Sequence, residues 1–112
     1  MNTPSPEIYQ YQARQQLRTL CQAMLAGELP FLEGALQARA LQGQTGIAND
    51  DPDMRTLAVI ISETDHLPPR AIQHRWSAAA LAQLQPEFVK TEEWARKFAE
   101  QACRNLVARL SD

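Results

Sequence analysis

With 112 residues, of which 45% are hydrophobic and 21% charged, the chain has the size and composition of one globular domain. Its net charge of −2 disfavours nucleic acid as a partner, because nucleic acid needs a concentrated basic face. The sequence contains no apolar run near the roughly 18 residues that span a bilayer, and no visible secretory signal. We therefore expect a cytoplasmic protein with no membrane partner, with one domain over residues 1–112 and disorder at residues 1–5.

The first half of the chain predicts two helices. Ser5 suits a helix cap and Pro6 a first helical residue, and Gly27 ends the pattern. Five apolar residues at helical spacing predict the buried face of this helix: Ala13, Leu17, Leu20, Cys21 and Met24. A second helix is expected over residues 30–42, and a loop follows it.

A third helix is predicted to begin at Asp51-Pro52, with Asp51 as the cap. The run Leu57–Ile61 contains β-branched residues and could by itself be a strand. The cap before the run, and the lack of a partner strand in the sequence, favour a helix. Its buried face would comprise Met54, Leu57, Ile60 and Ile61.

The second half predicts short helices over residues 70–76 and 77–84, a break at Gln85-Pro86, and a long last helix over residues 86–110. Glu92 falls within the apolar face of that helix, so its carboxylate needs a partner. The candidate partners are Arg14, Arg18 and Arg39. Together these patterns predict an all-α fold, a compact bundle of four main helices with one or two short extra helices.

Two cysteines, Cys21 and Cys103, both lie in helical patterns. We expect two reduced and packed thiols. A disulfide or a redox pair is the alternative.

The octapeptide Ser62–Pro69, with the sequence S-E-T-D-H-L-P-P, follows the most hydrophobic run and must turn the chain. Structural roles are expected for Glu63, Asp65 and His66, with ion pairs to Arg70 or Arg75 and with His66 stabilising the end of the third helix. The E-x-x-H spacing of Glu63 and His66 is half of a di-iron ligand pattern, but the sequence has no second copy. A single metal site with Glu33 is the chemical alternative.

Two further groups are candidate binding residues. Asp50, Asp51 and Asp53 lack the glycine and closing glutamate of a calcium loop, so helix capping accounts for them better. Trp76 and Trp94 could belong to the core or anchor a partner, since tryptophan dominates interface energetics. The segment 50–65 has five acidic residues against one arginine, a local charge of −4.

The run Ser62–Pro68, with Trp76-Ser77 and Ala80-Leu81 after it, resembles a group of small bacterial all-helical proteins of unknown function. Asp50–Asp53 and the E-G-A element Glu33–Ala35 also match that group, and Cys103 is similar to its late cysteine. Some small acidic helical bacterial proteins of this size are immunity proteins against contact-delivered toxins, and the chain is similar to them in build.

The sequence favours a non-catalytic protein-binding module, immunity- or adaptor-like, that binds a basic protein or forms a homodimer. Its expected binding residues are Asp50, Asp51, Asp53, Glu63, Asp65, His66, Trp76 and Trp94. We expect no cofactor and no catalytic residue. The alternative is a protein that binds a metal or small ligand, possibly an enzyme, through Glu33, Glu63, Asp65 and His66.

Overall fold

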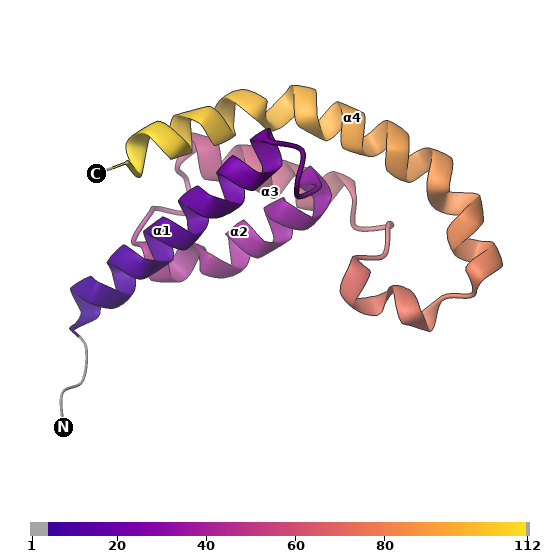
Figure 1. Cartoon of the computed structure of the whole chain (residues 1–112), viewed down its shortest axis with the longest axis horizontal. Coiled ribbons are helices and arrows are strands. Elements are labelled where there is room, and N and C mark those ends of the chain that lie inside the picture. The colour runs from indigo at the N-terminus through magenta and orange to yellow at the C-terminus, as the bar shows by residue number, and fades with distance from the viewer. Residues whose placement is uncertain (1–4, 112) are drawn as a thin grey trace.

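The computed structural model describes residues 5–111, and every element within that range is a helix (Figure 1). In chain order these are α1 (Pro6–Leu25), α2 (Phe31–Thr45), α3 (Pro52–Glu63), the 3₁₀ helix η1 (Arg70–Arg75) and α4 (Ala78–Arg109). The predicted all-α fold is confirmed, and Leu57–Ile61 is helical. Of residues 1–5, where we expected disorder, residues 1–4 lie outside the described range, and Ser5 directly precedes α1.

Helices α1, α2 and α3 pack together and α4 lies across them (Figure 1). In each helix the apolar residues recur at helical spacing and so form one apolar face, and these faces meet in one core. Its largest fully buried side chains come from all four helices: Leu17, Cys21, Met24, Phe31, Met54, Leu57, Ile60, Cys103 and Leu106. The faces predicted for α1 and α3 are confirmed, with Leu20 and Ile61 packed at the margin of this core.

The E-G-A element has a packing role at its glycine. A Cβ atom on Gly34 would lie only 2.3 Å from the Met24 sulfur, so α1 and α2 approach closely here because position 34 has no side chain. Ala35, on the same helix, is also fully buried. Gly34 therefore sets the spacing of the α1–α2 pair at this point.

The predicted break at Pro86 is wrong, because residues 78–109 form one continuous helix. Ser77 caps it as expected, accepting a hydrogen bond from the Ala80 amide at 3.1 Å. Proline frees the carbonyl four residues earlier, here that of Ala82. Since Ala82 and Pro86 are both exposed, solvent can satisfy that carbonyl, and the helix bends rather than ends (Figure 1).

The early part of α4 and η1 project from the body of the molecule, and we call residues 70–89 the arm (Figure 1). Between Pro68 and Ala95 no residue is fully buried. The molecule measures 51 × 34 × 24 Å along its principal axes. The predicted bundle is therefore present, with an arm that the sequence did not predict.

Side chains of α1 donate hydrogen bonds to the carbonyl groups at the carboxyl-terminal ends of two other helices. The Thr45 carbonyl, at the end of α2, accepts from Arg14 Nε at 2.8 Å and Gln10 Nε2 at 3.2 Å. The Leu110 carbonyl after α4 accepts from Gln15 Nε2 at 3.4 Å. Because the last carbonyls of a helix have no partner within it, these contacts satisfy groups that would otherwise depend on water.

The Glu92 carboxylate accepts hydrogen bonds from the first backbone amides of α2. The prediction that Glu92 pairs with an arginine is therefore wrong. Glu92 Oε1 accepts from the Phe31 amide at 2.5 Å and its Oε2 from the Leu32 amide at 3.1 Å. The residue before α2 is Pro30, whose side chain cannot cap a helix. A carboxylate from α4 therefore supplies the cap and complements the positive end of the helix dipole.

The three arginines expected to pair with Glu92 are placed elsewhere. Arg14 bonds to Thr45, and Arg39 donates to the side-chain oxygen of Gln42. Arg18 has a buried Nε with no hydrogen-bond partner within the described residues.

Cys21 on α1 and Cys103 on α4 are free thiols with no exposed surface. The hydrogen bond to Cys103, together with burial, raises the pKa of the Cys21 thiol. Both thiols pack in the core, as the sequence predicts.

The Glu92 cap predicts a stability difference between two adjacent glutamates. Glu92→Ala leaves two amides at the start of α2 without an acceptor and should cost roughly 1–3 kcal/mol of unfolding free energy. Glu93→Ala removes only an exposed pair with Lys97 and should cost less than about 1 kcal/mol. Urea unfolding measures both, and equal losses would show that the Glu92 carboxylate caps nothing.

Candidate functional site

The octapeptide Ser62–Pro69 is the turn that joins α3 to the arm. Thr64 ends α3: its Oγ1 donates to the Ile60 carbonyl at 2.6 Å and its amide to the Ile61 carbonyl at 3.3 Å. Leu67 and Pro68 are buried and anchor the turn to the body. The carbonyl of Pro68 also accepts from the Gln73 side chain at 3.0 Å. The turn thus has a structural role, and Thr64 performs the end-capping that we expected of His66.

His66 pairs with a residue that the sequence did not indicate. Its Nε2 lies 2.6 Å from Glu87 Oε1 on α4, and its Nδ1 lies 4.0 Å from Asp65 Oδ1. The expected ion pairs of Glu63 or Asp65 with Arg70 or Arg75 are absent from the described part of the chain. His66 therefore links the turn to α4, over a sequence separation that gives no local signal.

Glu33 holds the other side of the arm. Its Oε1 accepts from the Arg70 backbone amide at 2.7 Å, so a carboxylate on α2 binds the first residue of η1. Glu33 borders both a small hollow under the octapeptide and a larger groove beside α4. The glutamate of the E-G-A element therefore positions the arm.

The four residues of the ligand-binding alternative do not form one site. Glu33 and Asp65 line the small hollow, of about 200 Å³, whereas Glu63 and His66 line a different one. Ligand pockets usually have about 300–1,000 Å³. Within residues 5–111, no three His, Cys, Asp or Glu side chains are grouped so that they could hold a metal ion.

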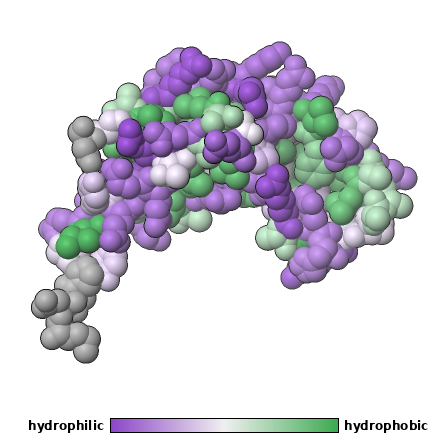
Figure 2. Space-filling model, viewed as in Figure 1, coloured by the Kyte–Doolittle hydropathy of each residue, from purple (hydrophilic) through white to green (hydrophobic). Residues whose placement is uncertain are grey.

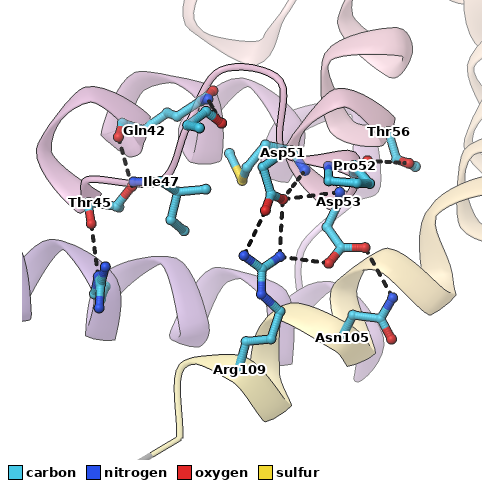
Figure 3. Close-up of polar contacts among 12 residues, drawn as sticks. Gln42, Thr45, Ile47, Asp51, Pro52, Asp53, Thr56, Asn105 and Arg109 are labelled. Atoms are coloured by element: carbon cyan, nitrogen blue, oxygen red, sulfur yellow. Dashed lines mark hydrogen bonds and ion pairs between the residues drawn. The ribbon is translucent and has the colours of Figure 1, made fainter.

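The acidic cluster before α3 is partly neutralised by α4 (Figure 3). Asp51 accepts from the Asp53 and Met54 amides, which confirms it as the cap of α3. Arg109 reaches Asp51 at 2.6 Å and Asp53 at 2.8 Å, and Asn105 donates to Asp53 at 3.0 Å. The hydrogen bond from Arg109 lowers the pKa of the Asp51 carboxyl below its ordinary value.

Arg109 changes the charge predicted for this segment. Asp51 and Asp53 have side chains only 12% and 15% exposed, and both pair with that arginine. Asn105 and Arg109 lie four residues apart on α4, but their partners are more than 50 residues away in the sequence, so local spacing did not indicate this contact. Asp50, Glu63 and Asp65 are exposed and remain available to a partner.

The two tryptophans lie at the surface. Trp94 is 37% exposed and stacks on Phe98, which is 43% exposed, with ring centroids 5.1 Å apart and planes at 13°. Trp76, the residue that follows η1 in the arm, is 41% exposed. Trp94 borders an open hollow of about 610 Å³ whose other lining residues are Glu63, His66, Pro86, Glu87, Lys90 and Thr91. We call this the Trp94 hollow.

The Trp94 hollow brings together three residues that the sequence analysis predicted as binding residues and one that it did not. Glu63, His66 and Trp94 were predicted as binding residues; Glu87 was not, and nothing in its local sequence separates it from a solvated helix position. Asp51 and Asp53 lie outside the hollow and are occupied by Arg109. Trp76 also lies apart from it, on the arm.

No protein-family model, curated protein or solved structure matches this chain. Among the described residues, no helix is long and apolar enough to cross a membrane.

The Asp51–Arg109 pair predicts a stability difference that depends on pH. Arg109→Gln should cost roughly 1–3 kcal/mol near neutral pH, because Asp51 and Asp53 lose their shared cation. The folded pKa of Asp51 is lowered, so the stabilisation is present above the ordinary aspartate value of about 4 and is lost as pH falls through the lowered value. Wild type and variant should therefore converge in acid.

Arg104→Gln is the matched control for this measurement. Among the described residues, Arg104 pairs only with Glu100, four residues earlier on the exposed face of α4, and its loss should cost less than about 1 kcal/mol. Urea unfolding at about pH 7 and about pH 3 measures each protein. An Arg109→Gln loss that is the same at both pH values would contradict the role given to Asp51.

Proposed function

We propose that the chain is a non-catalytic, cytoplasmic protein-binding module that binds a basic partner protein through the Trp94 hollow. The observation that carries this proposal is the exposed stack of Trp94 on Phe98 beside that hollow. Two aromatic rings in contact on the surface of a long helix expose apolar area that a small globular protein normally buries. Aromatic side chains in such a position are typical anchors of an interface.

The charges around the hollow favour a basic partner. Its lining holds two carboxylates, Glu63 and Glu87, against the single ammonium of Lys90, and the His66 imidazole contacts Glu87. Asp65 lies beside His66 and is 82% exposed at its side chain. Charges at the rim of an interface steer association and select the sign of the partner, whereas the aromatic rings supply affinity.

The similarity in size and build to small acidic helical immunity proteins also supports a binding role. An immunity or adaptor protein needs a surface rather than a catalytic constellation. A homodimer through Trp94 is the second form of this proposal, because it would cover the same aromatic rings without using the carboxylates.

The test is affinity capture of partners from the native cell with a matched pair of aromatic variants. Trp94→Ala should weaken capture of a basic partner by about thirtyfold, the effect of losing an interface anchor of about 2 kcal/mol. Tyr9→Ala removes an aromatic ring that is 52% exposed on α1, away from the hollow, and should leave capture unchanged. Glu63→Gln should slow association and reduce its dependence on salt.

Light scattering on the purified protein distinguishes the two forms of the proposal. A dimer that Trp94→Ala converts to a monomer supports self-association through the rings. The use of the Trp94 hollow would be refuted if the protein is a monomer and the Trp94→Ala and Tyr9→Ala variants capture the same proteins equally well.

A further inference from the structure

The Trp94 indole has one face turned toward the hollow. Phe98 follows Trp94 by one turn of α4, and its ring lies almost parallel to the indole, at 13°. Side chains of a helix lean toward its amino terminus, so the Phe98 ring lies against Trp94 and the indole extends over the preceding turn. The residues of α4 that line the hollow with Trp94 all come before it: Pro86, Glu87, Lys90 and Thr91. Phe98 thus covers one face of the indole, and the opposite face borders the hollow.

That opposite face is open to a ligand. Phe98 is the only stacking partner of Trp94 among the described residues. The electrons of an aromatic ring give its face a negative potential, which attracts a cation placed over it. Tryptophan offers the strongest such face of the aromatic side chains. The indole therefore supplies one half of a cation site.

The carboxylate of Glu63 supplies the other half. Glu63 is the last residue of α3, it lines the same hollow, and it is exposed. It has no ion pair among residues 5–111, whereas Glu87 is bonded to His66 at 2.6 Å. With a neutral imidazole, the lining has two negative charges against the one positive charge of Lys90. The charge that no partner neutralises is that of Glu63.

The surface around the hollow calls for a charged occupant rather than a purely apolar one. Hydrophilic residues predominate along the upper edge of the molecule in Figure 2, where α4 runs, and hydrophobic residues form only small groups among them. An apolar segment lying here would desolvate these polar groups without pairing them, which costs free energy. A single long cationic side chain covers the ring and leaves the polar groups around it in water.

Between the two cationic side chains, the geometry of the hollow suits arginine better than lysine. A guanidinium group is planar, so it can stack on the indole face and direct its N–H groups sideways to a carboxylate. It is also more weakly hydrated than an ammonium group, so that its transfer from water to an aromatic surface costs less. A lysine ammonium is a compact point charge that gains less from a flat ring beside one carboxylate.

We propose that the Trp94 hollow is an arginine-binding subsite. The guanidinium of an arginine on the partner protein would stack on the free face of Trp94 and pair with Glu63. This inference rests on the function proposed above and names the side chain of the basic partner that enters the hollow. Lys90 opposes the bound guanidinium by charge repulsion, since its ammonium lines the same hollow.

The test observes the two tryptophans separately by nuclear magnetic resonance. The indole Nε1–H groups of Trp76 and Trp94 give two signals, because the chain has two tryptophans, and Trp94→Phe identifies which is which. A blocked pentapeptide with one central arginine is added to the wild-type protein. A single side chain binds with dissociation constants on the order of millimolar, so the peptide is titrated to about 20 mM. The Trp94 signal should move in a saturable manner, and the Trp76 signal should stay in place.

Two further peptides define the chemistry that the subsite recognises. The same peptide with citrulline, which has nearly the shape of arginine without its charge, should leave the Trp94 signal in place. The lysine peptide should bind at least about fivefold more weakly than the arginine peptide.

Three variants test the roles of the charged residues. Glu63→Gln should weaken binding of the arginine peptide about tenfold. It removes an acid from the carboxyl-terminal end of α3, where negative charge is unfavourable, so the fold is not put at risk. Glu7→Gln, at the start of α1, removes the same charge outside the hollow and should leave the affinity unchanged. Lys90→Ala should strengthen binding about threefold, because the opposing ammonium is lost.

Three outcomes would overturn the arginine subsite. They are a Trp94 signal that does not move, equal affinities for the arginine and lysine peptides, and equal weakening by Glu63→Gln and Glu7→Gln. Any of these, together with capture that Trp94→Ala abolishes, would leave the basic partner in place and remove only the arginine. Arginine binding at Trp94 with capture that Trp94→Ala does not change would keep the subsite and remove the proposed protein partner.

Discussion

Helix α4 contributes side chains to the amino-terminal ends of two other helices, and the arrangement of the fold depends on these contacts. Glu92 accepts the first amides of α2, and Arg109 neutralises Asp51, the cap of α3. The first four amides of a helix have no partner within it; Glu92 supplies acceptors for two of them in α2, and Arg109 holds the aspartate that caps α3. The two contacts lie near the middle and the end of one 32-residue helix, which fixes α2 and α3 relative to the same rod.

That geometry explains why the surfaces of α4 remain available. The side chains of α4 that contact the beginnings of α2 and α3 lie from Glu92 onward, and the earlier turns project as the arm without a fully buried residue. Glu33 and His66 attach the arm at its base through Arg70 and Glu87. The proposed site for a basic protein uses one side of this projecting part, where Pro86 and Glu87 line the Trp94 hollow.

The sequence predicts those features that depend on local pattern. The helices follow from apolar spacing, and Asp51 follows from the cap-and-proline signal, which is why both were correct. The partner of Glu92, the pairing of His66 with Glu87 and the continuity of α4 through Pro86 were not predicted. The two pairings join segments that are far apart in the chain, and the continuity of α4 depends on whether the carbonyl freed by Pro86 faces solvent. The spacing of residues within one helix contains no information on these points.

Amide hydrogen exchange at the start of α2 is the most direct test of the role given to α4. Phe31 and Leu32 donate to Glu92, whereas the amide of the next residue, Glu33, has no acceptor among residues 5–111. Exchange at Phe31 and Leu32 should therefore be slower than at Glu33, and Glu92→Ala should abolish the difference. Equally fast exchange at all three amides in the wild-type protein would contradict the account.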